Sequence, residues 1–219
     1  MSDKKFIPAL GFDFLTIYYD LAIKLTMPEK KFRRLLVEII NPLDNETILE
    51  FGFGTGQNLI LVKNKNPNIE LIGLDIDPKV KEIATHKLKK NKLEIPLNLY
   101  DGNNFPYQDN QFHKVYSCLV FHQLDAETKD KCLKEIYRIL KPGGELIIAD
   151  WGKAQNKLMR LTFGLVQILD GFKTTNDNVK GKMPQFIEKV GFHNVSISHS
   201  INTIIGTFSY FRAIKKQLQ

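Results

Sequence analysis

The sequence predicts an α/β fold, in which helices cover both faces of a mostly parallel sheet. From Thr47 onward, short apolar runs alternate with segments of helical length, as in repeated strand–helix units. A glycine-rich turn, "GFGTG", follows the first of these apolar runs. Near the C-terminal end, two strand-like runs follow each other without a helix between them. We therefore expect an antiparallel hairpin to complete the sheet.

The composition indicates a single globular domain spanning residues 1–219. Hydrophobic residues make up 43% of the chain, which is enough to bury a substantial core. The two cysteines, Cys118 and Cys132, stand in unrelated contexts, so they predict neither a disulfide framework nor a metal site. No apolar run has the form of a signal peptide or the length of a membrane span, so we expect a cytoplasmic protein.

The formal net charge of +7 raises nucleic acid and anionic lipid as classes of partner. The basic residues are, however, spread along the chain and interleaved with acidic and apolar ones, as in residues 79–94. That distribution is typical of the solvated face of a helix. We therefore interpret the charge as a generally basic surface.

Residues 1–45 are predicted to form an N-terminal helical cap. The segment 11–25 would make a helix that is apolar nearly all round. A second helix is expected from Pro28, because proline suits the first turn of a helix. The apolar positions of this second helix follow helical spacing: Phe32, Leu35, Leu36, Ile39 and Ile40.

The elements of the sheet follow in order along the chain. Strands are expected at 48–51, 70–75, 97–101, 115–119 and 145–150. Helices are expected from about Gln57, at 78–92, at 126–140 with Asp125 as its cap, and at 184–190. Residues 141–144, "KPGG", are expected to form a turn, and Gly191 to end the last helix. The hairpin is expected to consist of residues 194–200 and 203–214.

Three features fall at the carboxyl ends of predicted strands, where open parallel sheets bind ligands. The first is an acid followed by three glycines at alternate positions: Glu50, Gly52, Gly54 and Gly56. The other two are Asp75 and Asp101, which end the second and third strands. A carboxylate after the second strand is suited to accept hydrogen bonds from ribose hydroxyls, and one after the third from an adenine amino group.

The glycine spacing separates two nucleoside-containing ligands. A dinucleotide fold favours G-x-G-x-x-G, but Gln57 occupies the position of the last glycine. Glu50 would repel a pyrophosphate, whereas it would attract a cation. S-adenosylmethionine carries a sulfonium and an ammonium group, so it fits this site better than a nicotinamide dinucleotide does.

Four motifs resemble those of a known family: "ILEFGFGTGQN", "LIGLDIDP", "LYDGNNFPYQDNQFHKVYSCLVFHQL" and "EIYRILKPGGELIIADWG". In this order they are similar to the motifs of class I S-adenosylmethionine-dependent methyltransferases, in the ubiquinone/menaquinone C-methyltransferase-like (methyltransferase type 11) branch. The resemblance covers the chain from about Phe12 to its end. It implies a Rossmann-like, seven-stranded sheet whose last strand is antiparallel, and S-adenosyl-L-methionine as the cofactor.

The resemblance also implies roles for particular residues. The methionine end of the cofactor would lie at the glycine turn, the ribose at Asp75 and the adenine at residues 101–103. Leu119 and His122 would lie near the reacting methyl group. The full set of expected cofactor-binding residues is Glu50, Gly52, Phe53, Gly54, Gly56, Asn58, Asp75, Ile76, Asp101, Gly102, Asn103 and Leu119.

Two residues depart from the family pattern. Phe53 stands where many relatives have Cys, which is a change of packing that leaves the cofactor assignment intact. His113 stands where relatives usually have Asp, just before the fourth strand. We expect His113 to be a surface histidine or one whose hydrogen bonds are satisfied, with no part in catalysis.

Residues 151–182 are predicted to form a lid-like insertion on the ligand side of the sheet, with a helix at 157–169. Its apolar stripe predicts either extra core or the wall of an apolar pocket, and the second interpretation favours a small lipid-like or quinone-like acceptor. Lys157 and Arg160 at its edge could meet an anionic head group or membrane surface. We expect the acceptor pocket to be lined by Phe14, Tyr18, Tyr19, His122, Trp151, Arg160 and Phe163.

His122 is also the candidate catalytic base, because an imidazole can take a proton near neutral pH. A base is needed only if the acceptor must lose a proton. His122 could instead pack against the substrate or hydrogen-bond one of its carbonyl groups.

Three alternatives remain open. An amino-directed nucleic-acid methyltransferase would show Asn/Asp-Pro-Pro-aromatic where this chain has "SCLVFHQL", and a C5 enzyme needs a thiolate, whereas Cys118 lacks a preceding proline and is expected to be buried. A methyltransferase-like fold can also serve as a non-catalytic module that binds S-adenosylmethionine. A nicotinamide dehydrogenase is disfavoured by Gln57 and Glu50.

Overall fold

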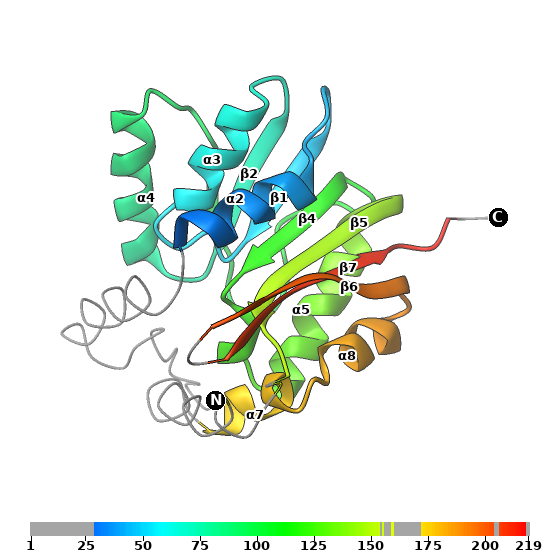
Figure 1. Cartoon of the computed structure of the whole chain (residues 1–219). Coiled ribbons are helices and arrows are strands. Elements are labelled where there is room, and N and C mark those ends of the chain that lie inside the picture. Colours follow the sequence, from blue (N-terminus) through cyan, green and yellow to red (C-terminus); the bar gives the residue numbers. More distant parts are fainter. Residues whose placement is uncertain (1–28, 154, 156–158, 160–171, 204–205, 218–219) are drawn as a thin grey trace, which may run out of the picture.

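The computed structural model describes residues 29–153, 155, 159, 172–203 and 206–217 (Figure 1). The helix expected at 11–25 lies outside the described residues, and so does Pro28, the expected start of the second helix. Most of the helix expected at 157–169 also lies outside them. From Glu29 to Lys153 the chain is described without a gap.

Seven strands form one sheet, in the order β3-β2-β1-β4-β5-β7-β6 (Figure 1). The strands are β1 (Thr47–Phe51), β2 (Glu70–Asp75), β3 (Leu97–Leu99), β4 (Phe112–Cys118), β5 (Leu140–Trp151), β6 (His193–Asn202) and β7 (Thr207–Ile214). β1 to β5 pair in parallel, and β7 is antiparallel to both β5 and β6. The predicted α/β fold with a closing hairpin is therefore confirmed.

Helices cover both faces of the sheet. On one face lie α2 (Glu29–Ile40), α3 (Gln57–Lys65) and α4 (Pro78–Lys90). On the other face lie α5 (Ala126–Ile139) and α8 (Met183–Val190) (Figure 1). A short helix, η1 (Phe121–Gln123), follows β4. Another, α7 (Phe172–Val179), precedes α8.

The core is divided by the sheet into two apolar clusters. Ile48 packs with α2, α3 and α4, whereas the next residue, Leu49, packs with α5 and α8. Successive strand residues point to opposite faces, so a strand covered on both sides must be apolar throughout. β1 largely follows this rule, because four of its five residues are buried and only Glu50 among them is polar.

The expected start of α5 and the expected end of α8 are confirmed, whereas β3 ends earlier than expected. Asp125 caps α5 by accepting from the Thr128 N–H at 2.8 Å, and Gly191 ends α8 with φ 111°. β3 ends at Leu99, two residues before the predicted end, because the chain turns at Asp101 and Gly102.

Residues 141–144 were expected to form a turn, but they belong to β5. The Gly143 N–H donates to the Lys215 carbonyl at 3.0 Å, and the Lys215 N–H donates to the Gly144 carbonyl at 2.9 Å. The pairing of β4 with β5 shifts register across this segment, between Phe112 and Lys114. The glycines therefore form an irregularity within a strand, which Lys215, directly after β7, stabilises.

Candidate functional site

The glycine turn connects β1 to α3 at the carboxyl edge of the sheet, where β2 and β4 lie on either side of β1. A Cβ on Gly52, which has φ 74°, would come within 2.3 Å of the Val120 side chain. At Gly54, with φ 49°, no heavy atom lies within 4 Å of the position that a Cβ would take. Gly52 is therefore required for packing, whereas Gly54 leaves its backbone open to a ligand.

Asp75, at the end of β2, ties the glycine turn to the neighbouring strand. Its Oδ2 accepts from the Gly54 N–H at 2.9 Å, and its Oδ1 accepts from the Ile76 N–H at 2.7 Å and the Asp77 N–H at 3.1 Å. Burial raises the pKa of Asp75. The carboxyl group thus fixes the turn and lies beside the open position at Gly54.

Glu50 lies beneath the turn and is fully buried. Its Oε1 accepts from Asn58 Nδ2 at 2.9 Å, and its Oε2 accepts from the Tyr116 hydroxyl at 3.1 Å. Arg33 of α2 donates in turn to Asn58 Oδ1 at 2.6 Å. Burial raises the pKa of Glu50 to about 8, so the protein's own groups favour a neutral carboxyl group at pH 7. This neutral form differs from the charged carboxylate expected from the sequence.

The loop after β3 carries the residues expected at an adenine. Asp101 is exposed, and its Oδ1 accepts from the N–H groups of Asn103 and Asn104 at 2.9 and 3.2 Å, which lowers its pKa. A Cβ on Gly102 would lie 3.3 Å from the Ile76 side chain. The fold therefore brings Ile76, Asp101 and Gly102 to one place, although 25 residues separate Ile76 from Asp101 (101 − 76).

Leu119 adopts a backbone conformation that leucine rarely takes. It follows β4 directly, and its φ is 60°. Its N–H donates to the Ala149 carbonyl at 2.9 Å, which holds this conformation in place. A non-glycine residue with positive φ indicates local strain, and such strain clusters at functional sites.

His122 of η1 is paired with Asp150 of β5, and both side chains are fully buried. His122 Nδ1 lies 2.7 Å from Asp150 Oδ1, and the His122 N–H donates to Asp150 Oδ2 at 3.0 Å. A carboxylate can only accept, so the Nδ1 atom carries the proton and Nε2 is the basic nitrogen. Asp150 thus fixes both the position and the tautomer of the ring.

Asp150 was not among the residues expected at the site. It ends the apolar run of β5, and β5 pairs with β4 through Cys118 and Ala149. An acid at the end of one strand therefore lies next to the residues that follow the neighbouring strand. The strand-end rule that identified Asp75 and Asp101 would have found Asp150 as well.

The described part of the predicted lid, α7, is held against the site by buried polar contacts. Lys129 of α5 is fully buried and donates to the Thr174 carbonyl at 2.9 Å. Asn178 Nδ2 donates to the Trp151 carbonyl at 3.0 Å. The segment that follows β5 therefore returns to η1, beside His122.

Two of the expected ligand-contacting side chains point into the core. The Phe53 ring is 3% exposed, and the Trp151 ring is 1% exposed and packs edge-on against Phe208 at 5.9 Å. A contact of Phe53 with a cofactor would therefore be made by its backbone. Five of the expected pocket residues lie outside the described residues: Phe14, Tyr18, Tyr19, Arg160 and Phe163.

Two residues were expected to be structural, and both are. His113 accepts from the Thr47 N–H at 2.9 Å, and its Nε2 lies 2.8 Å from Lys141 Nζ, so both ring nitrogens have partners. Cys118 is buried, and burial raises the pKa of its thiol to about 12. A thiol with such a pKa is a poor nucleophile at neutral pH.

Within the part of the chain that the structure describes, His, Cys, Asp and Glu side chains form no group of three that could hold a metal ion. In the same residues, no helix has both the length and the apolar character that crossing a membrane requires.

Comparisons with known proteins agree with this geometry. Residues 48–144 match the family described as "Methyltransferase domain". The chain is 30% identical over 141 residues to a demethylmenaquinone methyltransferase of Thermotoga maritima. The aligned region covers 64% of this chain and 59% of that protein. A demethylmenaquinone methyltransferase of Lactobacillus johnsonii is 28% identical over 211 residues, covering 87% and 82% of the two chains. The chain thus spans about three fifths of the Thermotoga relative.

A solved structure shares the fold at low sequence identity. It is phosphoethanolamine N-methyltransferase 2 of Haemonchus contortus, in complex with S-adenosyl-L-methionine. The two chains superpose with a TM-score of 0.69 at 16% identity, over 84% of this chain and 52% of the other. At this identity the likeness shows a common fold and leaves the substrate open.

Proposed function

We propose that the chain is a class I S-adenosylmethionine-dependent methyltransferase of the ubiquinone/menaquinone C-methyltransferase-like branch, and that it transfers a methyl group from S-adenosylmethionine to a small apolar acceptor. The observation that carries this proposal is the glycine turn, which Asp75 ties to β2 while the space beside Gly54 stays open. The names of the two relatives favour an acceptor of the quinone type.

The residues present fit this cofactor. The open backbone at Gly54 permits close approach of a ligand, and Asp75 beside it offers carboxylate oxygens to ribose hydroxyls. Asp101, Gly102 and Asn103 would hold the adenine, and Glu50 with Asn58 would lie beneath the methionine end. A cationic group of the cofactor near Glu50 would favour the ionised form of this carboxyl group, and the two opposite charges would then balance.

The cofactor supplies a methyl group already activated by a sulfonium. The chain's own residues would then act chiefly by holding the acceptor close and by excluding water. If the acceptor must lose a proton, His122 Nε2 would take it, while Asp150 holds Nδ1–H and stabilises the charged ring. If it need not, the same pair would position the acceptor.

The proposed acceptor pocket depends on the lid-like insertion. Residues 151–182 would cover an apolar pocket, and α7 is the described part that supports this placement. Lys157 and Arg160 would let the protein contact an anionic membrane surface from the cytoplasm. An amphiphilic acceptor dissolved in a membrane would then reach the site from the lipid surface.

Methyl transfer can be tested directly with cofactor that carries a labelled methyl group. The protein is incubated with a panel of reduced quinone precursors, phospholipids, polar metabolites and RNA, and labelled product is separated by organic extraction. We expect label in the quinol or lipid fraction. Selective labelling of the polar metabolites would contradict an apolar acceptor. Tight cofactor binding without transfer to any member would favour the non-catalytic module, and salt-dependent binding and labelling of RNA would favour the nucleic-acid alternative.

A further inference from the structure

We propose that Arg138 and Glu135 of α5 are positioning residues for recognition of the adenosine half of the cofactor. They act through the adenine-side loop, residues 101–111, which contains Asp101, Gly102 and Asn103. The inference rests on the proposed function, because the ligand of the loop that these two residues hold would be S-adenosylmethionine. Neither residue was among those expected to bind the cofactor.

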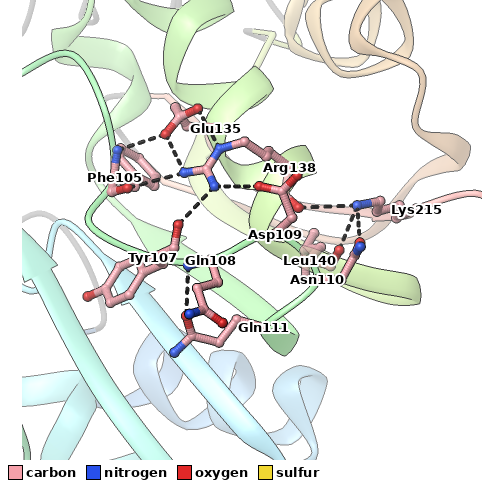
Figure 2. A network of polar contacts seen from close by, with 10 residues as sticks. All are labelled: Phe105, Tyr107, Gln108, Asp109, Asn110, Gln111, Glu135, Arg138, Leu140 and Lys215. Atoms are coloured by element: carbon pink, nitrogen blue, oxygen red, sulfur yellow. Dashed lines mark hydrogen bonds and ion pairs between the residues drawn. The ribbon is translucent and has the colours of Figure 1, made fainter.

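The Arg138 guanidinium uses all five of its N–H donors (Figure 2). Nε and Nη2 donate to the two carboxylate oxygens of Glu135, at 2.9 and 2.8 Å. Nη1 donates to the Tyr107 carbonyl at 2.8 Å and to Asp109 Oδ1 at 2.7 Å, and Nη2 also donates to the Phe105 carbonyl at 3.1 Å. Three of the five acceptors therefore belong to the adenine-side loop. The planar fork of arginine fits them, whereas lysine has only three donors on a single nitrogen.

Phe105 is the residue of the loop that this pair fixes most completely. Glu135 Oε2 accepts from the Phe105 N–H at 2.7 Å, while Arg138 holds the Phe105 carbonyl. Both backbone groups of one residue are thus held by one helix. The Phe105 ring is buried and packs on Phe51 at 5.1 Å and on Tyr100 at 5.2 Å.

These ring contacts link the helix to both halves of the cofactor site. Phe51 directly precedes Gly52 of the glycine turn, and Tyr100 directly precedes Asp101. The Tyr100 N–H also donates to the Asp75 carbonyl at 3.1 Å. A shift of Phe105 would therefore displace the residues expected at the adenine, which lie two to four positions earlier in the chain.

The far end of the loop is anchored to the same helix (Figure 2). The Asn110 N–H donates to the Arg138 carbonyl at 3.0 Å, and the Gln111 N–H donates to the Ile139 carbonyl at 2.7 Å. Lys215 of the C-terminal segment donates to Asn110 Oδ1 at 2.8 Å and to the Leu140 carbonyl at 2.7 Å. The loop is thus closed at residue 105 and again at residues 109–111, so its conformation depends on α5.

The ion pair is more than half covered, with side-chain exposures of 30% for Arg138 and 17% for Glu135. The Arg138 guanidinium lowers the pKa of Glu135, so the pair stays charged at neutral pH. A partly exposed pair adds little to global stability, whereas a bidentate fork adds geometric specificity. We therefore place its main effect on loop geometry and hence on ligand affinity.

The test is a double-mutant cycle read by calorimetric titration with S-adenosylhomocysteine, a cofactor product that contains the same adenosine. The four proteins are the unchanged chain, Arg138→Lys, Asp101→Ala and the double variant, all titrated well below their melting temperatures. We expect Arg138→Lys to weaken binding about tenfold in the unchanged chain and hardly at all in the Asp101→Ala background. Glu135→Gln serves as a second variant, should Arg138→Lys fold poorly.

The matched control is Arg212→Lys, which alters another arginine–glutamate pair, with Glu145, in the β5–β7 part of the sheet. Its affinity should match that of the unchanged chain. The inference would be overturned if Arg138→Lys and Glu135→Gln both bound S-adenosylhomocysteine as tightly as the unchanged chain. It would also be overturned if the loss of affinity in the double variant were the sum of the losses in the two single variants. Either result would leave the proposed function standing. Failure of the unchanged chain to bind at all would overturn both.

Discussion

The imidazole of His122 lies 2.7 Å from the carboxylate of Asp150, and neither side chain is exposed. A second contact, from the His122 N–H to the same carboxylate, fixes the backbone of η1 as well as the ring. Pairs of this kind set the tautomer of a histidine that must accept a proton at its other nitrogen. The pair is therefore the most direct structural argument for a base at this site.

The substitution Asp150→Asn tests this role. An amide cannot serve as acceptor for both contacts as a carboxylate does, so the ring loses its fixed tautomer and the stabilisation of its charged form. For an acceptor that must lose a proton, we expect turnover to fall by roughly a hundredfold or more. The acceptor KM and the affinity for S-adenosylhomocysteine should change little. The measurement is steady-state kinetics across pH 6 to 9.

Asp130→Asn provides the control for that experiment. Asp130 lies on α5 and makes ion pairs with Lys134 and Lys189. Its replacement should leave turnover unchanged. Full turnover by Asp150→Asn or by His122→Ala, with an acceptor that is deprotonated during the reaction, would remove the pair as a base.

The pKa of Glu50 predicts a dependence of stability on pH. Its folded-state pKa of about 8 exceeds its ordinary value of 4.5, so the folded protein keeps a proton that the unfolded chain releases between these values. This contribution to stability is therefore present below pH 4.5 and is lost as the pH rises toward 8. At about 1.4 kcal/mol per pKa unit, the loss is on the order of a few kcal/mol.

Glu50→Gln removes the titrating group and keeps the size of the side chain. Relative to the unchanged chain, we expect this variant to gain stability progressively from pH 5 to pH 8. Urea unfolding at pH 5, 6.5 and 8 measures the difference. If the two proteins lost stability in parallel over this range, Glu50 would have to be ionised in the folded chain.

Gly52 and Gly54 should respond differently to alanine. At Gly52 the new Cβ would overlap Val120, so Gly52→Ala should destabilise the fold by roughly 1–3 kcal/mol. At Gly54 there is space, so Gly54→Ala should cost about 1 kcal/mol for its positive φ and still abolish cofactor binding. Thermal unfolding and calorimetry on the two variants separate these effects. Unchanged binding by Gly54→Ala would show that no ligand uses the open position.

Much of the fold could be predicted because its signals are local. Asp125 and Gly191 mark the ends of helices through contacts within a few residues, and both positions are confirmed. The closing hairpin follows from the absence of a helix between two strand-like runs, and it is confirmed too. The local pattern "KPGG" wrongly predicted a turn at 141–144, because the residue that pairs with this segment, Lys215, lies about seventy residues later in the chain.

The site was predicted less completely, for the same physical reason. Asp75 and Asp101 were identified because ligands bind beyond the carboxyl ends of parallel strands, and the fold places both residues at that edge of the sheet. Burial raises the pKa of Glu50, against the lowering effect of hydrogen bonds from Asn58 and from Tyr116, 66 residues away, so no local pattern indicates its protonation. The contacts of the Arg138 guanidinium become apparent only in the structure, where the loop after β3 lies against α5 (Figure 2).

The measurement that tests the central claim most directly is calorimetric titration of S-adenosylhomocysteine into the unchanged chain and into Asp75→Asn. Asp77→Asn is the matched control, because Asp77 caps α4 through the Lys79 N–H and asparagine caps equally well. We predict binding in the micromolar range, weakened at least about tenfold by Asp75→Asn and unchanged by Asp77→Asn. An unchanged chain that does not bind, or an Asp75→Asn variant that binds equally well, would contradict the account.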